Sequence, residues 1–208
     1  MDQLHQIAIA AGLAWASGIR LYAGIFIVGL LGRFGYVHLP TDLLLLQHDF
    51  VLAASGIMLV VEFLVDKVPG FDSAWDAIHT FIRIPIGAFL AWGAMGDSAP
   101  AVQLAAAIFG GAITGGTHLA KAGTRAAINT SPEPFSNWTA SFGEDGALFV
   151  GLWLAFHHPI VFLVLLALFF VFVVWALPKL FRFVVRAWRK LRGSRSVASR
   201  NVGHPERN

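Results

Sequence analysis

Cysteine is absent from this chain of 208 residues. Its absence excludes disulfide bonds, thiolate metal sites and catalysis by a thiol. Charge is scarce as well, because only 13% of the residues are charged, against about a quarter in a soluble domain. Motifs of the HExxH, P-loop and GxSxG types do not occur. We therefore expect no metal and no cofactor, and an enzyme is not the favoured interpretation.

Hydrophobic residues make up 57% of the sequence and gather in long runs. The runs reach the ~20 residues that a helix needs to cross a bilayer. They do not alternate in polarity as the strands of a membrane barrel do, and backbone groups in lipid must be satisfied within the segment. The sequence thus predicts an all-α, polytopic membrane helix bundle of about six transmembrane helices. These are expected at 7–31, 50–65, 75–95, 100–122, 140–156 and 160–177.

Basic residues are concentrated at the C-terminus, where nine of the 15 Lys and Arg residues follow Pro178. The chain therefore divides into a transmembrane helical domain, 1–178, and a basic amphipathic cytoplasmic tail, 179–208, whose end is expected to be disordered. Such a tail suits anionic lipid headgroups and not nucleic acid. The expected partners are the lipid bilayer and a small solute or ion, and a homo-oligomer remains open.

The positive-inside rule places this tail in the cytoplasm. Six crossings would put the N-terminus there too, together with Lys67, Lys121 and Arg125. The other side would then hold Arg33 and the acids Asp42, Asp49 and Asp97.

The first predicted helix is interrupted by the sequence Ser17-Gly18-Ile19-Arg20. If this break makes a re-entrant pair of half-helices, the N-terminus moves to the opposite side. Two pairs of short segments within the chain also resemble each other in sequence. Residues 18–24 resemble 116–123, which would be an inverted repeat typical of transporters, and residues 71–75 resemble 135–138, which would be a parallel one.

Charged side chains inside lipid cost several kcal/mol unless they face the interior of a bundle. At 3.6-residue spacing, the polar residues of each of the first five helices fall on one stripe, whereas the sixth is apolar all round. The stripes predict a charged chamber that faces the cytoplasm. Its candidate substrate- or ion-binding residues are Arg20, Glu62, Asp66, Lys67, Asp72, Asp76, His79, Arg83, His118, Lys121, Arg125, Asn137, Glu144 and Asp145.

The signs of these stripes are complementary between neighbouring helices. The predicted ion pairs are Arg83 with Glu62 or Asp66, and Lys121 or Arg125 with Glu144 or Asp145. Buried ion pairs can also serve only to fix how helices pack. That interpretation stays open beside a binding role.

Three strings together resemble a known family: SGIRLYAG at 17–24, EFLVDKVPGFDSAWDAIHTFIRIPIGA at 62–88 and THLAKAGTRAAINTSPEPFSNWTASFGED at 117–145. They are similar to an uncharacterised bacterial integral membrane protein family known only as a domain of unknown function. The likeness covers roughly residues 5–178. It implies a protein of the inner membrane and brings no activity or site residues.

The function favoured by these residues is that of a small transporter or permease-like membrane protein, for an anionic or phosphate-bearing solute or lipid. Basic side chains and His118 would suit an anionic group, and the carboxylates a proton or a cation. Two alternatives remain: an intramembrane enzyme acting on a phosphate-containing lipid, and a non-catalytic membrane scaffold.

Overall fold

The computed structural model describes residues 2–68, 71–96, 98–129 and 134–201. All regular structure in these residues is helical, so the prediction of an all-α membrane bundle is confirmed. The elements are α1 (Gln3–Arg33), η1 (Thr41–Gln47), α2 (Asp49–Val65), α3 (Phe71–Ala94), α4 (Pro100–Ile128), α5 (Pro134–His157) and α6 (Pro159–Asn201).

A capping side chain and a proline in the first turn determine where two of the helices begin. The Asp2 side chain accepts a 2.8 Å hydrogen bond from the backbone N–H of His5 and so caps α1. Pro100 occupies the first turn of α4, where its missing N–H is no loss. Two other prolines, Pro85 and Pro178, lie inside α3 and α6.

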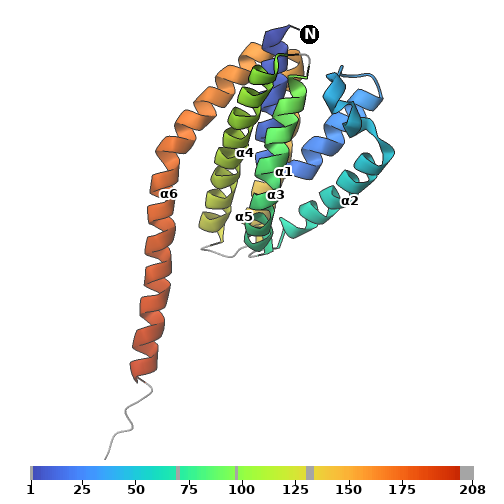
Figure 1. Cartoon of the computed structure of the whole chain (residues 1–208). Coiled ribbons are helices and arrows are strands. Elements are labelled where there is room, and N and C mark those ends of the chain that lie inside the picture. The colour runs from blue at the N-terminus through green and yellow to red at the C-terminus, as the bar shows by residue number, and fades with distance from the viewer. Residues whose placement is uncertain (1, 69–70, 97, 130–133, 202–208) are drawn as a thin grey trace, which may run out of the picture.

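Three helices of the described chain contain stretches long and apolar enough to cross a membrane, namely Gln3–Arg33, Ala74–Ala94 and Pro159–Arg182. The bent pair of η1 and α2, which meet at 64°, would add a fourth. In Figure 1, α3 and α4 run along the length of the bundle, and α6 starts at the end where the N-terminus lies and runs past the other end. The short element η1 is a 3-10 helix whose Leu43 and Leu46 side chains are buried.

The first helix does not cross the bundle. It breaks at Arg20, whose φ of −145° and ψ of 91° are extended and not helical. A methyl group added to Gly24 would lie 3.2 Å from the Cβ atom of Ala16. Residues eight apart in a straight helix are about 12 Å apart along the axis. The two halves of α1 therefore fold back on each other at Arg20.

Both ends of α1 consequently lie at one end of the bundle. Gln3 shares a cavity with Met95, which follows α3. His5 shares another with Tyr36, which follows α1, and with His157, the last residue of α5. A straight helix of 31 residues would separate its ends by about 46 Å.

Within the bundle, the N-terminus and the far end of α6 therefore lie at opposite ends, as the re-entrant alternative predicts and six crossings do not. The side of the membrane on which each end lies stays a prediction. Because α1 enters and leaves the bundle at the same end, the N-terminus lies at that end. Helix α6 starts there as well and runs toward the opposite end (Figure 1). The re-entrant alternative at Ser17-Gly18-Ile19-Arg20 describes the structure. Asp97 lies outside the described residues, and nothing in the fold decides between the two repeats.

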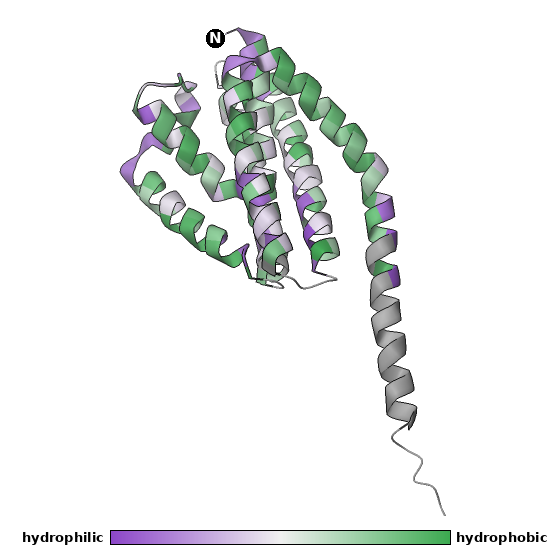
Figure 2. Cartoon of the chain, turned by 180° about the vertical axis from the view of Figure 1, so that it is seen from behind, coloured by the Kyte–Doolittle hydropathy of each residue, from purple (hydrophilic) through white to green (hydrophobic). Residues whose placement is uncertain are grey.

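Small residues allow α1 to pack closely in the centre of the bundle. Its buried face is rich in alanine and glycine, and at Gly18 a methyl group would meet the Thr117 Cβ atom at 2.6 Å and the Thr114 carbonyl oxygen at 2.7 Å. The close approach of α1 to α4 thus requires glycine there. On the outside, α6 presents apolar side chains to the surroundings (Figure 2), as a lipid-facing helix should.

Candidate functional site: a charge network at the break in α1

The polar stripes of five helices meet around the break in α1. Five carboxylates and four basic side chains form one connected network in which neighbouring charged groups lie within 4.0 Å of each other. We call this set the charge network: Arg20, Glu62, Asp66, Asp76, Arg83, Lys121, Arg125, Glu144 and Asp145. All nine were predicted from the sequence as site residues, and the structure brings them together.

Arg83 joins α3 to both α1 and α2. Its Nη2 atom lies 2.6 Å from Glu62 Oε1, so the ion pair predicted between these helices is present. Its Nη1 atom donates to the carbonyl oxygens of Gly18 at 3.2 Å and Ile19 at 3.0 Å. These carbonyls lie at the end of the first half of α1, where the break removes their helical partners. Arg83 therefore stabilises the break directly.

Lys121 of α4 reaches the same point from the other side. Its Nζ atom donates to the Ile19 carbonyl oxygen and to Asp66 Oδ2, both at 3.1 Å. It also lies 3.5 Å from Asp76 Oδ1 and 3.7 Å from Glu144 Oε2. Cations are favourable at the C-terminal end of a helix. Two cationic side chains, Arg83 and Lys121, thus lie at the C-terminal end of the half-helix that ends at Ile19.

Two arginines tie α5 to the network. Arg20, the residue at the break, has its Nε atom 2.8 Å from Asp145 Oδ1 and donates through Nη2 to the Ser141 hydroxyl at 2.7 Å. Arg125 binds both carboxylate oxygens of Glu144, with distances of 3.0 and 2.8 Å, in the bidentate geometry typical of strong arginine pairs. The predicted pairing of α4 with α5 is therefore present.

The network contains five carboxylates and four basic groups, and the charge of a fifth basic group, Lys67, interacts with Asp66 and Asp145 from nearby. The network is also almost fully shielded, since Arg20, Glu62, Asp66, Arg83 and Arg125 have no exposed surface. Only Glu144 and Asp145 of its members retain appreciable exposure, with side chains 16% and 25% exposed. Access to these charges therefore runs along α5.

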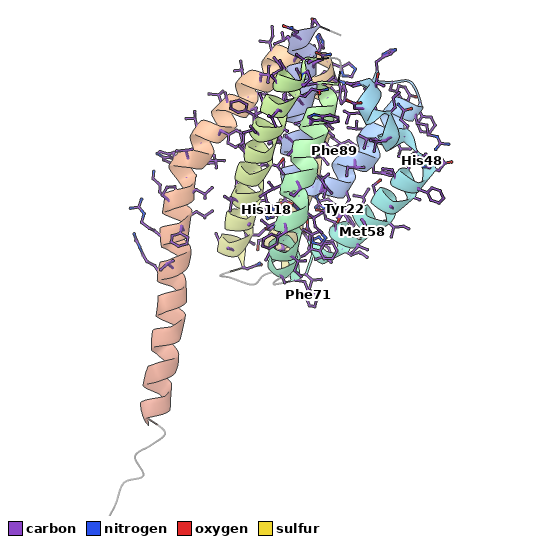
Figure 3. All side chains as sticks on the ribbon, viewed as in Figure 1. Tyr22, His48, Met58, Phe71, Phe89 and His118 are labelled. Carbon is purple, nitrogen blue, oxygen red and sulfur yellow. The ribbon has the colours of Figure 1, made fainter. Side chains whose placement is uncertain are left out.

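Two histidines lie beside the network. The ring of His79 stacks on Trp75 with ring centroids 3.9 Å apart, and its Nδ1 atom lies 2.9 Å from the Trp75 carbonyl oxygen. His118 Nε2 lies 2.7 Å from the hydroxyl of Thr80, which itself donates to the carbonyl oxygen of Asp76. Since that hydroxyl has one proton, His118 must donate to it through Nε2. Figure 3 shows His118 and Tyr22 at a similar level of the bundle.

The remaining predicted site residues fall into three positions. Asn137 accepts from Arg125 at 3.2 Å through its side-chain oxygen and donates to Asn129 at 2.9 Å. Lys67 lies beside the network: its Nζ atom is over the Phe63 ring, 2.9 Å from the centroid, and its charge interacts with those of Asp145 and Asp66. The side chain of Asp72 lies outside the described residues.

A cavity of about 420 Å³ reaches the network between α1, α4, α5 and α6. Lys121, Glu144 and Thr117 form its polar part, and Phe172 and Leu180 belong to its mostly apolar wall. Among the described residues, no group of three His, Asp or Glu side chains is arranged to hold a metal ion. Lys121, Glu144 and Thr117 offer hydrogen-bond donors and acceptors at the polar end of the cavity.

Some residues of the site were not predicted. Thr80 and Thr117 were missed although each lies four positions from a predicted site residue, Asp76 and Lys121, on the same helical face. That spacing could have identified them. No side-chain pattern could have identified the Ile19 carbonyl, because a backbone group becomes available only where the helix breaks.

Comparison with known proteins gives a family but no activity. No curated protein and no solved structure matches the chain. A family model described as "Domain of unknown function (DUF4126)" matches residues 7–179, a range that includes every residue of the charge network. The chain therefore belongs to the family of the domain of unknown function DUF4126.

Proposed function

We propose that this protein is a small transporter or permease-like protein of the bacterial inner membrane, with the charge network as its substrate or ion site. The observation that carries the proposal is the break of α1 at Arg20 inside the bundle, where the carbonyls of Gly18 and Ile19 face cationic side chains. Interrupted helices whose ends meet at a buried site are typical of secondary transporters.

The pairing within the network favours a proton or a cation over the anionic or phosphate-bearing solute that the sequence suggested. Each of the four basic groups already has a carboxylate within 4.0 Å. An added anion would compete with these carboxylates for the basic groups, whereas a proton or a cation would bind to the carboxylates.

The same proposal includes an orientation. The C-terminal ends of α2 and α4 lie toward the end of the bundle to which α6 runs (Figure 1). Lys67, Lys121 and Arg125 are at or near these two helix ends, and nine of the 15 basic residues follow Pro178. By the positive-inside rule this end faces the cytoplasm, and the N-terminus faces the periplasm. The network would then open toward the cytoplasm along α5.

A scaffold function is the main competitor, because a network of paired charges can serve packing alone. An enzyme acting on a phosphate-containing lipid is less well supported, since its anionic substrate would compete with the carboxylates for the basic groups. The three functions differ in what the purified protein does, so one reconstitution can separate them.

The test uses proteoliposomes with a trapped pH-sensitive dye and an imposed potassium diffusion potential. The parent protein is expected to carry protons or a supplied cation, and Asp66→Asn is expected to abolish this flux while remaining folded. Asp49→Asn is the matched control, because Asp49 pairs with Arg33 at the other end of the bundle. Absence of flux for every ion and potential would refute the transporter. Turnover of a phospholipid in detergent would instead support the enzyme.

A further inference from the structure

The surroundings of the Lys121 ammonium group resemble a binding site for a cation. One backbone carbonyl and three carboxylates lie within 3.7 Å of Nζ: Ile19, Asp66, Asp76 and Glu144. The carbonyl belongs to the C-terminal end of a half-helix, which carries partial negative charge. A lysine occupies the position in which a free ammonium ion would be equally well held.

Several carboxylate oxygens around this position accept no hydrogen bond. Neither oxygen of Asp76 does so, although its Oδ1 atom lies 3.1 Å from Arg83 Nη2 and 3.5 Å from Lys121 Nζ, and Oδ1 of Asp66 has no hydrogen-bond partner either. The Thr117 hydroxyl, 1% exposed, has no hydrogen-bond partner either. Unsatisfied buried polar atoms are costly, and they commonly mark a place where a ligand or water binds.

The cavity between α4, α5 and α6 gives an approach to this position. Its polar end holds Lys121, Thr117 and Glu144, whereas its wall is built of apolar residues that include Phe172 and Leu180. A ligand that fits both parts has a cationic, hydrogen-bond-donating head and an apolar body. The three carboxylates and the carbonyl oxygen around Lys121 Nζ favour a positive head over a negative one.

We infer that the Lys121 position is a binding site for a primary amine with an apolar body, which lies in the cavity between α4, α5 and α6. In the protein without ligand, the ammonium group of Lys121 occupies this site. The ligand displaces it, and the ligand's ammonium group then contacts Glu144 and Asp66. This inference rests on the proposed transport function, for which it names the substrate class.

Chemical rescue tests the site. Lys121→Ala removes the tethered ammonium and should lower the Tm of the protein in detergent. Ethylammonium, butylammonium and hexylammonium should restore it, the longer chains at lower concentration, with a rise of roughly 5–10 °C at about 100 times the dissociation constant. Tetramethylammonium, which has no N–H donor, should restore much less at the same ionic strength.

Lys179→Ala is the matched control, because the Lys179 ammonium group lies over the Trp175 ring of α6, 3.2 Å from its centroid, and not in the network. The amines should leave its Tm unchanged. Rescue of Lys179→Ala to the same extent, equal rescue by tetramethylammonium, or absence of rescue in folded Lys121→Ala would each overturn the inference.

A second variant keeps the inference testable if Lys121→Ala does not fold. The chain has no cysteine, so Lys121→Cys carries a single thiol. An aminoethyl methanethiosulfonate reagent should restore an ammonium there and raise the Tm, whereas the neutral methyl reagent should not. Butylammonium should slow the labelling, and equal Tm values with both reagents would overturn the site.

The two proposals can fail separately. Amine rescue without any flux in proteoliposomes would leave the amine site standing and refute transport. Proton or cation flux with no response to amines would leave the transport proposal standing and refute the amine site.

Discussion

The Nη1 atom of Arg83 donates a 3.0 Å hydrogen bond to the carbonyl oxygen of Ile19, 64 residues earlier in the chain. The same guanidinium group holds Glu62 through Nη2 at 2.6 Å. The bend of α1 and the ion pair between α2 and α3 therefore share one side chain. Any change at Arg83 acts on both.

This sharing makes the Glu62–Arg83 pair asymmetric. Arg83→Met should lower the free energy of unfolding by about 3–5 kcal/mol, because it strands a buried carboxylate and two backbone carbonyls. Glu62→Gln should cost less, since Arg83 keeps Asp76 at 3.1 Å. The double variant should recover only part of the loss, because the carbonyls of Gly18 and Ile19 remain without their donor. Thermal unfolding of the parent, the two single variants and the double variant in detergent measures these changes in the free energy of unfolding.

The same double variant also distinguishes binding from packing. A site that needs the charges predicts a protein that is folded and inactive in the flux assay. Full flux in Glu62→Gln, Arg83→Met would remove this pair from the site and favour a packing role for it.

The re-entrant α1 predicts the topology of single-cysteine variants, which the cysteine-free chain makes straightforward. Cysteines at Gln3, Tyr36 and Ser98 should react with a membrane-impermeant maleimide from one side of the membrane. Cysteines at Lys67 and Phe135 should react only from the other side. Labelling of positions 3 and 67 from the same side would contradict the fold-back of α1.

The contact of α1 with α4 predicts a marked difference between two glycines. Gly18→Ala should destabilise the protein by about 1–3 kcal/mol or more, because the new methyl group meets Thr117 and the backbone of Thr114. A methyl group at Gly146 of α5 meets nothing within 4 Å. Gly146→Ala should therefore be neutral or stabilise by up to about 1 kcal/mol. Equal effects on thermal unfolding would show that α1 and α4 are not packed this closely.

The hydrogen bond between Thr80 and His118 predicts the form of that histidine. With the Thr80 proton directed to the Asp76 carbonyl, neutral His118 should carry its proton on Nε2. Nitrogen-15 histidine spectra of the protein in detergent should show this tautomer. Thr80→Val should shift the His118 signal and cost about 1–3 kcal/mol, since it leaves a buried donor unsatisfied. An unchanged His118 signal in Thr80→Val would contradict the assignment.

Much of the network could be predicted from the sequence because each charged residue in lipid must face inward. With 3.6 residues per turn, this requirement alone predicts that Asp76 and Arg83 lie on one face of their helix, and that Lys121 and Arg125 lie on one face of theirs. Complementary signs then indicated which helices are neighbours. The prediction worked because it depends on one residue and its own helix at a time.

The features that were missed depend on several helices at once. The direction of α1 after Arg20 is set by donors from α3 and α4, so the sequence of α1 leaves both a crossing and a return open. Lys67 has the same charge as Lys121 but contacts Phe63. The pairing of every basic group with a carboxylate, which changes the expected ligand from anion to cation, became visible only when the network's membership was known.

The dependence of the α1 break on distant donors has a consequence for how the protein is made. The carbonyls of Gly18 and Ile19 are synthesised early, but the side chains that satisfy them, Arg83 and Lys121, follow 64 to 102 residues later. Until α4 leaves the ribosome, the first segment cannot complete its fold in the bilayer. Nascent chains that end before Pro100 should therefore leave residues 3–33 sensitive to protease, and chains that extend beyond α4 should protect them.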